Sequence, residues 1–117
     1  MIVDFGADSC DPYKKMAPLL IELNQELRGK AVVKFVDVWK NGQAAAGLPI
    51  QAIPTQFFFN EDGSPYVPAD IESAARNGFM MYETKETGEH IYTIHQGYMS
   101  KEDTLIVLKE MGNDFFR

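Results

Sequence analysis

The chain contains a single cysteine, at a position where a thiol could be reactive. Cys10, the only cysteine among 117 residues, follows a short apolar run at residues 2–5 and precedes a segment whose pattern predicts a helix. A thiolate at a helix N-terminus gains from free backbone N–H groups and from the positive end of the helix dipole. Pro12 suits an early helical position, whereas Asp11 disfavours a second negative charge beside it. The sequence therefore leaves two interpretations open, a reactive thiol and an inert one.

The position three residues after the cysteine carries a tyrosine. In a dithiol enzyme the second thiol attacks the mixed disulfide, but the phenol of Tyr13 cannot form a sulfur–sulfur bond. A two-cysteine cycle is therefore excluded for this chain acting alone. What remains is monothiol chemistry, in which Cys10 attacks a disulfide and an external thiol such as glutathione releases it. Tyr13 has two open roles, as a hydrogen-bond donor to the thiolate or as a ring that fills space.

Three segments, in the same order along the chain, resemble thioredoxins. They are residues 4–18 (DFGADSCDPYKKMAP), residues 52–59 (AIPTQFFF) and residues 96–103 (QGYMSKED). The first resembles the active-site region, with a helix proline eight residues beyond the cysteine. The second resembles the Ile-Pro-Thr segment, and the third resembles the turn from the last strand into the last helix. The resemblance implies a thioredoxin-like fold with an atypical Cys-x-Pro-Tyr motif.

The same resemblance implies a set of site residues. The positions expected to be catalytic are Cys10, Tyr13 and Pro54, with the proline in the cis form and facing the cysteine. The positions expected to contact substrate are Asp11, Pro12, Ile53, Gln96 and Gly97. The backbone of Ile53 is expected to pair with an extended peptide, which would add a short strand of substrate.

Asp4 matches the buried acid of the family. In dithiol members this acid helps to move a proton from the second cysteine, which is missing here. An acid in an apolar strand often has a raised pKa, whereas the position of Asp4 near the first residue of the chain favours solvation. Both interpretations stay open, and we expect a structural or vestigial role.

Composition limits the classes of function. A formal charge of −6 argues against nucleic acid and against an anionic membrane as the main partner. One cysteine makes no internal disulfide, and no apolar run approaches the ~18 residues of a membrane span. We therefore expect a cytoplasmic protein in a reducing compartment. Thioredoxins carry a further strand and helix before the first strand of this chain, so a lost upstream signal would change that expectation.

The predicted elements form one α/β domain over residues 1–117, with an insertion at about 64–88. We expect a central mixed sheet of four or five strands flanked by helices. Predicted helices cover residues 11–27, 41–47, 70–77 and 100–111, and predicted strands cover residues 2–5, 31–38, 54–60, 79–84 and 90–95. The run at 31–38 is rich in β-branched residues, which is typical of a central strand covered on both faces.

Three further side chains are given structural interpretations. His90 and His95 are an odd number of residues apart, so on one strand they face opposite sides and cannot share a metal ion. We expect His95 to be a surface strand residue and Trp39 to pack at the end of its strand. No metal and no cofactor are expected.

The sequence favours monothiol thiol–disulfide exchange with a disulfide- or thiol-containing protein or with glutathione. The alternative is a redox-inactive protein-binding module, and a third possibility places the interaction in the insertion at 64–88. A disulfide-linked dimer through Cys10 is possible in air.

Overall fold

Strands and helices alternate along the first half of the chain. The computed structural model describes residues 1–7, 11–26, 32–50, 53–60 and 62–111, with the backbone alone for residues 11–17 and 44–45. The elements are β1 (Ile2–Gly6), α1 (Asp11–Glu26), β2 (Val33–Asp37), α2 (Gly42–Ala45), β3 (Thr55–Phe58), α3 (Ile71–Arg76), β4 (Phe79–Glu83), β5 (His90–Gln96) and α4 (Lys101–Glu110).

The strands form one mixed sheet of five in the order β2-β1-β3-β5-β4. β1 and β2 are parallel and are joined through α1, whereas β1–β3, β3–β5 and β4–β5 are antiparallel. The expected mixed sheet is therefore confirmed. The expectation that the strand at 31–38 is central is wrong, because β2 lies at the edge. Branched side chains indicate a pleated, partly buried surface, which an edge strand also provides.

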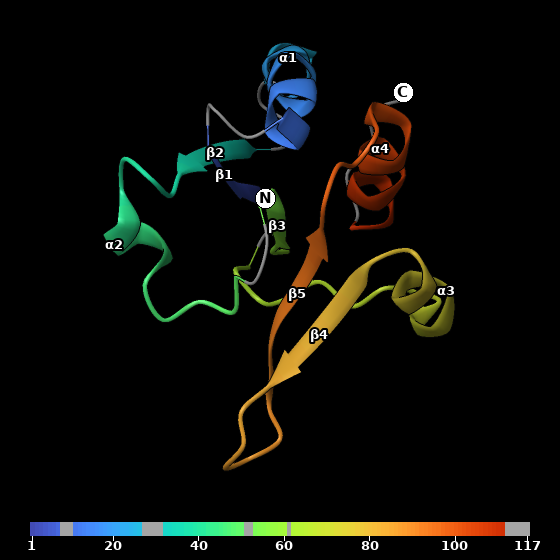
Figure 1. Cartoon of the computed structure of the whole chain (residues 1–117). Helices are drawn as coiled ribbons and strands as arrows, with labels where there is room; N and C mark the ends of the chain where they lie inside the picture. The colour runs from blue at the N-terminus through green and yellow to red at the C-terminus, as the bar shows by residue number, and fades with distance from the viewer. Residues whose placement is uncertain (8–10, 27–31, 51–52, 61, 112–117) are drawn as a thin grey trace.

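Helices cover both faces of the sheet. α1 and α4 lie together over one face, and α2 lies on the opposite side (Figure 1). On the α1/α4 face the buried core contains Leu20, Leu23, Val107 and Leu108 from the helices, packed with strand residues such as Phe58. The three-residue spacing of Leu20 and Leu23 places both on the face of α1 that meets the sheet, as the periodicity predicts.

The opposite face has an aromatic core. Phe57 makes edge-to-face contacts with Phe5 and Tyr92, at centroid distances of 5.2 and 5.3 Å. Ile94 completes the buried part, and the loop after α2 adds partly buried residues such as Leu48. Alternation along the strands explains this division, because successive side chains point to opposite faces.

The last helix is capped as the sequence predicts. The Ser100 side chain accepts a hydrogen bond from the backbone N–H of Asp103 at 3.1 Å. Lys101 then reaches across to α1, where its Nζ lies 2.6 Å from Glu22 and 2.9 Å from Glu26. These exposed contacts link α1 and α4, whose packing against each other and the sheet comes from the buried core.

Between β3 and β5 the chain forms the elements expected for residues 70–84. α3 begins after Asp70, whose carboxylate accepts from the backbone N–H of Ser73. β4 then pairs with β5 as an antiparallel hairpin. α3 lies beyond the edge of the sheet, on the same side of the molecule as α4 (Figure 1).

Candidate functional site

A row of polar side chains crosses the middle of the sheet. Asp4 on β1 is paired with Gln56 on β3, and Gln56 is paired with His95 on β5. Their exposed fractions are 0%, 1% and 8%, so all three are buried. Directly opposed residues on neighbouring strands lie close enough for their side chains to interact. The sheet register therefore brings together three polar groups that are far apart in the sequence.

Gln56 is the centre of this row. Its Nε2 donates to Asp4 Oδ1 at 2.9 Å and to the backbone oxygen of Gly97 at 3.1 Å. Its Oε1 lies 2.7 Å from Nδ1 of His95. Because the amide nitrogen is the donor to two oxygens, the amide oxygen accepts, and Nδ1 of His95 carries the proton. The side chain thus connects the buried acid, the histidine and the loop at Gly97.

Burial changes the titration of both ends of the row. Desolvation raises the pKa of Asp4 to about 6, and the hydrogen bond from Gln56 opposes the rise only in part. Among the residues that the structure describes, Asp4 Oδ2 has no hydrogen-bond partner. Burial lowers the pKa of His95, so its imidazole is neutral at pH 7. Asp4 is therefore an acid that gains and loses a proton close to neutral pH.

The start of β3 and the end of β5 meet at four of the expected site residues, Ile53, Pro54, Gln96 and Gly97. The backbone N–H of Gly97 donates to the carbonyl of Pro54 at 2.8 Å. Pro54 is buried, Ile53 and Gln96 are half-buried, and the Ile53–Pro54 peptide bond is cis. Gly97 has φ +92°, in the left-handed region that favours glycine.

The other expected site residues lie at the start of α1. Cys10 lies outside the described residues, and the side chains of Asp11, Pro12 and Tyr13 are also outside the description. α1 begins at Asp11, the residue that follows Cys10 in the chain, and β1 ends at Gly6. Residues 7–10 therefore connect the strand that carries Asp4 to the N-terminus of the helix.

Trp39 lies at the same end of the sheet. The backbone N–H of Val38, just before it, donates to the carbonyl of Gly6 at 2.9 Å, where β1 ends. Trp39 is 67% exposed, so the expectation that it packs is wrong. Its backbone N–H donates to the side chain of Asp37, which turns the chain outward after β2. An exposed tryptophan is a common anchor of protein interfaces.

The structure distinguishes the two interpretations of Asp4 and corrects the expectation for His95. Asp4 is not solvated, because β1 lies between β2 and β3 and contributes to the middle of the sheet. His95 is not a surface residue, because its ring points to Gln56 and stacks edge-on against Phe79. The importance of Gln56 was missed. The available signal was a long polar side chain directly before three phenylalanines, where burial demands a hydrogen-bond partner.

Metal-ligand geometry is not found in the described part of the chain, where no group of three or more His, Cys, Asp or Glu could hold an ion. His90 and His95 bond different partners: Thr93 Oγ1 lies 2.8 Å from Nε2 of His90, and Gln56 bonds His95. None of the described helices has the length and apolar character needed to cross a membrane.

Known proteins resemble this chain in sequence and in structure. The sequence model of the thioredoxin family matches residues 1–81. Thioredoxins of Staphylococcus aureus strains COL and MW2 are 42% identical over 64 residues, which cover 55% of this chain and 61% of those proteins. The chain thus matches about three fifths of the length of these relatives. Chloroplastic thioredoxin z has the same fold, with a TM-score of 0.58 and 22% identity over 95% of this chain and 76% of its own.

Proposed function

This chain belongs to the thioredoxin family, and we propose that it performs thiol–disulfide exchange with Cys10 as its only reacting thiol. The observation that carries the proposal is the position of Cys10 directly before α1, in the segment that resembles the family's active site. Free N–H groups at the helix start stabilise a thiolate there. With Tyr13 in the second position, resolution comes from outside the chain.

The proposed reaction has two balanced steps. The Cys10 thiolate attacks the sulfur of a mixed disulfide between glutathione and a protein, forming a Cys10–glutathione disulfide and releasing the protein thiolate, which takes a proton from water. A second glutathione thiolate then attacks the sulfur of the bound glutathione. This step forms glutathione disulfide and releases the Cys10 thiolate. The net change is one protein mixed disulfide reduced and one glutathione thiol oxidised to disulfide.

Asp4 is proposed to accept the proton that the Cys10 thiol loses when the thiolate forms. It lies on the strand that leads to Cys10, and its pKa of about 6 makes it mostly ionised at pH 7 and able to accept a proton. Gln56 fixes Oδ1, while Oδ2 has no partner among the residues described. The same amide holds the Gly97 carbonyl, so the acid and the groove keep one relative position.

The substrate is proposed to lie along Ile53, Pro54, Gln96 and Gly97, with an extended segment beside the strand ends. Trp39, exposed at the same end of the sheet, would contact the partner protein. We also propose the reducing cytosol as the compartment, because one cysteine can form no internal disulfide.

The test measures the rate at which the protein reduces a glutathionylated peptide in excess glutathione. The intact mass of the protein is followed during the reaction. We expect release of the peptide thiol and a transient adduct of glutathione on Cys10. The control C10S should show neither. A wild-type rate equal to that of C10S would contradict the proposal.

A second function is favoured by the exposed Trp39, namely a redox-inactive module that binds a protein segment in the same groove. In that case the wild type and C10S would bind one partner with equal affinity in reducing buffer, and W39A would lose it. A partner held only through a disulfide to Cys10 would contradict this alternative.

A further inference from the structure

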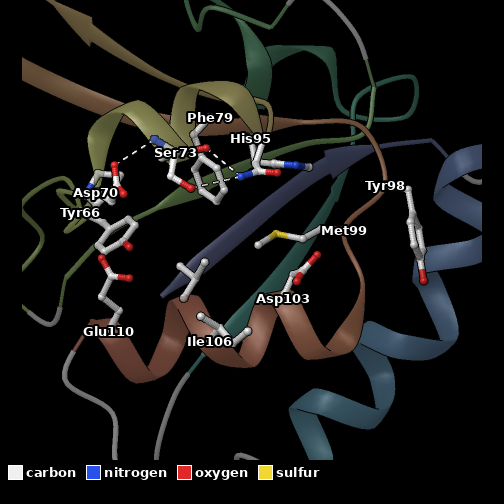
Figure 2. A pocket seen from close by; sticks show the side chains of 14 residues that line it. Tyr66, Asp70, Ser73, Phe79, His95, Tyr98, Met99, Asp103, Ile106 and Glu110 are labelled. Carbon is white, nitrogen blue, oxygen red and sulfur yellow. Dashed lines mark hydrogen bonds between the residues drawn. The ribbon is translucent and has the colours of Figure 1, made fainter.

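A cavity of about 450 Å³ opens between α3, α4 and the β4–β5 hairpin. Its size falls in the range of ligand sites, roughly 300–1,000 Å³. Figure 2 shows the side chains that line it, from Tyr66 and Asp70 on one side to Tyr98 and Asp103 on the other. The lining includes none of Ile53, Pro54, Gln96 and Gly97, so this cavity is distinct from the proposed thiol groove.

The charged side chains among the described lining of the cavity are acidic. Its described lining contains three carboxylates, Asp70, Asp103 and Glu110, and neither lysine nor arginine. His95 contributes no positive charge at pH 7, because burial lowers its pKa. Figure 2 shows the Asp103 carboxylate beside Met99, among the side chains that line the cavity. A cation entering the cavity would therefore meet negative charge without a competing positive side chain.

Two of the carboxylates are already held in place by the fold. Asp70 Oδ1 accepts from the backbone N–H of Ser73, and Glu110 Oε1 accepts from the backbone N–H of Ala69. Asp103 has its own backbone N–H capped by Ser100. Asp70 and Glu110 therefore need little reordering to contribute negative charge to the cavity.

Apolar side chains form part of the walls between the carboxylates, together with the polar side chains of Ser73, Asn77 and His95. Phe79, Met99 and Val107 line the cavity, with Met99 buried against the sheet. Figure 2 places Met99 beside Asp103, with Ile106 on the neighbouring turn of α4. Ile106 and Tyr98 are 62% and 48% exposed, so the rim offers apolar surface to a larger partner. An apolar stem with a cationic end matches this arrangement of walls and charge.

We propose that the cavity binds the side chain of a lysine in a partner polypeptide. The ammonium group lies near Asp103, the methylene stem packs on Met99 and Ile106, and the flanking residues of the partner contact Tyr98 at the rim. Lysine combines a point charge with a four-carbon apolar stem. This assignment is independent of Cys10 and of the proposed thiol exchange.

The test adds a peptide to the full chain and measures binding from the change in amide NMR chemical shifts. The peptide consists of alanines with one central lysine, and both of its ends are blocked so that they carry no charge. The comparison peptide replaces lysine with norleucine, which keeps the stem and removes the charge. We expect shifts at Asn77, Tyr98 and Asp103, and about tenfold or more weaker binding of the norleucine peptide, as expected for loss of a charged partner.

Two variants make the test specific. D103N should weaken binding of the lysine peptide about tenfold or more, whereas E102Q should change it less than about twofold. Both remove one acid from the first turn of α4, but Glu102 is not part of the lining. Equal losses in the two variants, or equal binding of the two peptides, would overturn the proposal. Cadaverine serves as the free amine, and binding as tight as the peptide's would overturn the assignment to a polypeptide.

Discussion

Replacement of the buried acid, D4N, should stabilise the fold by an amount that depends on pH. Asp4 is fully buried, and its pKa is raised from 3.8 to about 6 by desolvation. The folded state therefore binds a proton that the unfolded state has already lost between these two pH values. The free energy of unfolding falls as pH rises through this window, and the full cost of the charge is present above it.

The size of the effect follows from the shift. About two pKa units correspond to ~3 kcal/mol of destabilisation by ionised Asp4 at neutral pH. Asparagine is neutral at every pH, and its amide oxygen can still accept from Gln56 in place of Asp4 Oδ1. D4N should therefore be more stable than the wild type by up to ~3 kcal/mol at about pH 7.5. At about pH 4 the difference should fall below ~1 kcal/mol.

Urea unfolding followed by far-UV circular dichroism at both pH values gives these differences. D62N serves as a control of opposite sign, because hydrogen bonds from Ser64 lower the pKa of Asp62. Asp62 stabilises the fold above its unfolded pKa and loses that contribution as pH falls. A D4N difference that is the same at both pH values would refute the account of a buried, desolvated carboxylate.

Three further variants test the contacts around the row. Q56L should lower the free energy of unfolding by ~1–3 kcal/mol and raise the pKa of Asp4, because Asp4 and His95 lose the hydrogen bonds of Gln56. Urea unfolding measures the first effect and carbon NMR titration of Asp4 measures the second. G78A should lower stability by ~1–3 kcal/mol, since Gly78 has φ +90° and a Cβ would lie 3.2 Å from the His95 ring. K101A should cause a small loss that disappears in high salt, because the ion pairs of Lys101 are exposed.

Each of these has a clear contrary result. Q56L with wild-type stability and an unchanged Asp4 titration would remove Gln56 from the centre of the row. G63A is the matched control for G78A, because Gly63 has φ +87° but no atom within 4 Å of an added Cβ. Equal losses of stability in G78A and G63A would show that the loss comes from the backbone conformation and not from the contact with His95. A K101A loss that persists in high salt would indicate packing rather than charge.

Most of the fold could be predicted from local patterns. The leucine spacing in residues 19–23 and the Ser100 cap gave helices close to those observed. The strand order could not be predicted in the same way, because β-branched composition does not distinguish an edge strand from a central one. The position of β2 depends on pairing between segments that are distant in sequence.

The candidate site could be predicted only where it repeats a family segment. Pro54 and Gly97 were predicted on that basis, and a backbone hydrogen bond joins them. The row of Asp4, Gln56 and His95 could not be predicted, because it depends on the register of three strands. A shift of one residue in any pairing would turn one of these side chains to the other face.

The rate of Cys10 alkylation by iodoacetamide as a function of pH tests the central claim most directly, since the chain contains no other cysteine. Intact mass confirms a single adduct. Monothiol exchange by a thiolate at the start of α1 predicts a midpoint at about pH 6–7, well below the ordinary thiol value. A midpoint at about pH 8.5 or above, with slow modification, would contradict an activated Cys10.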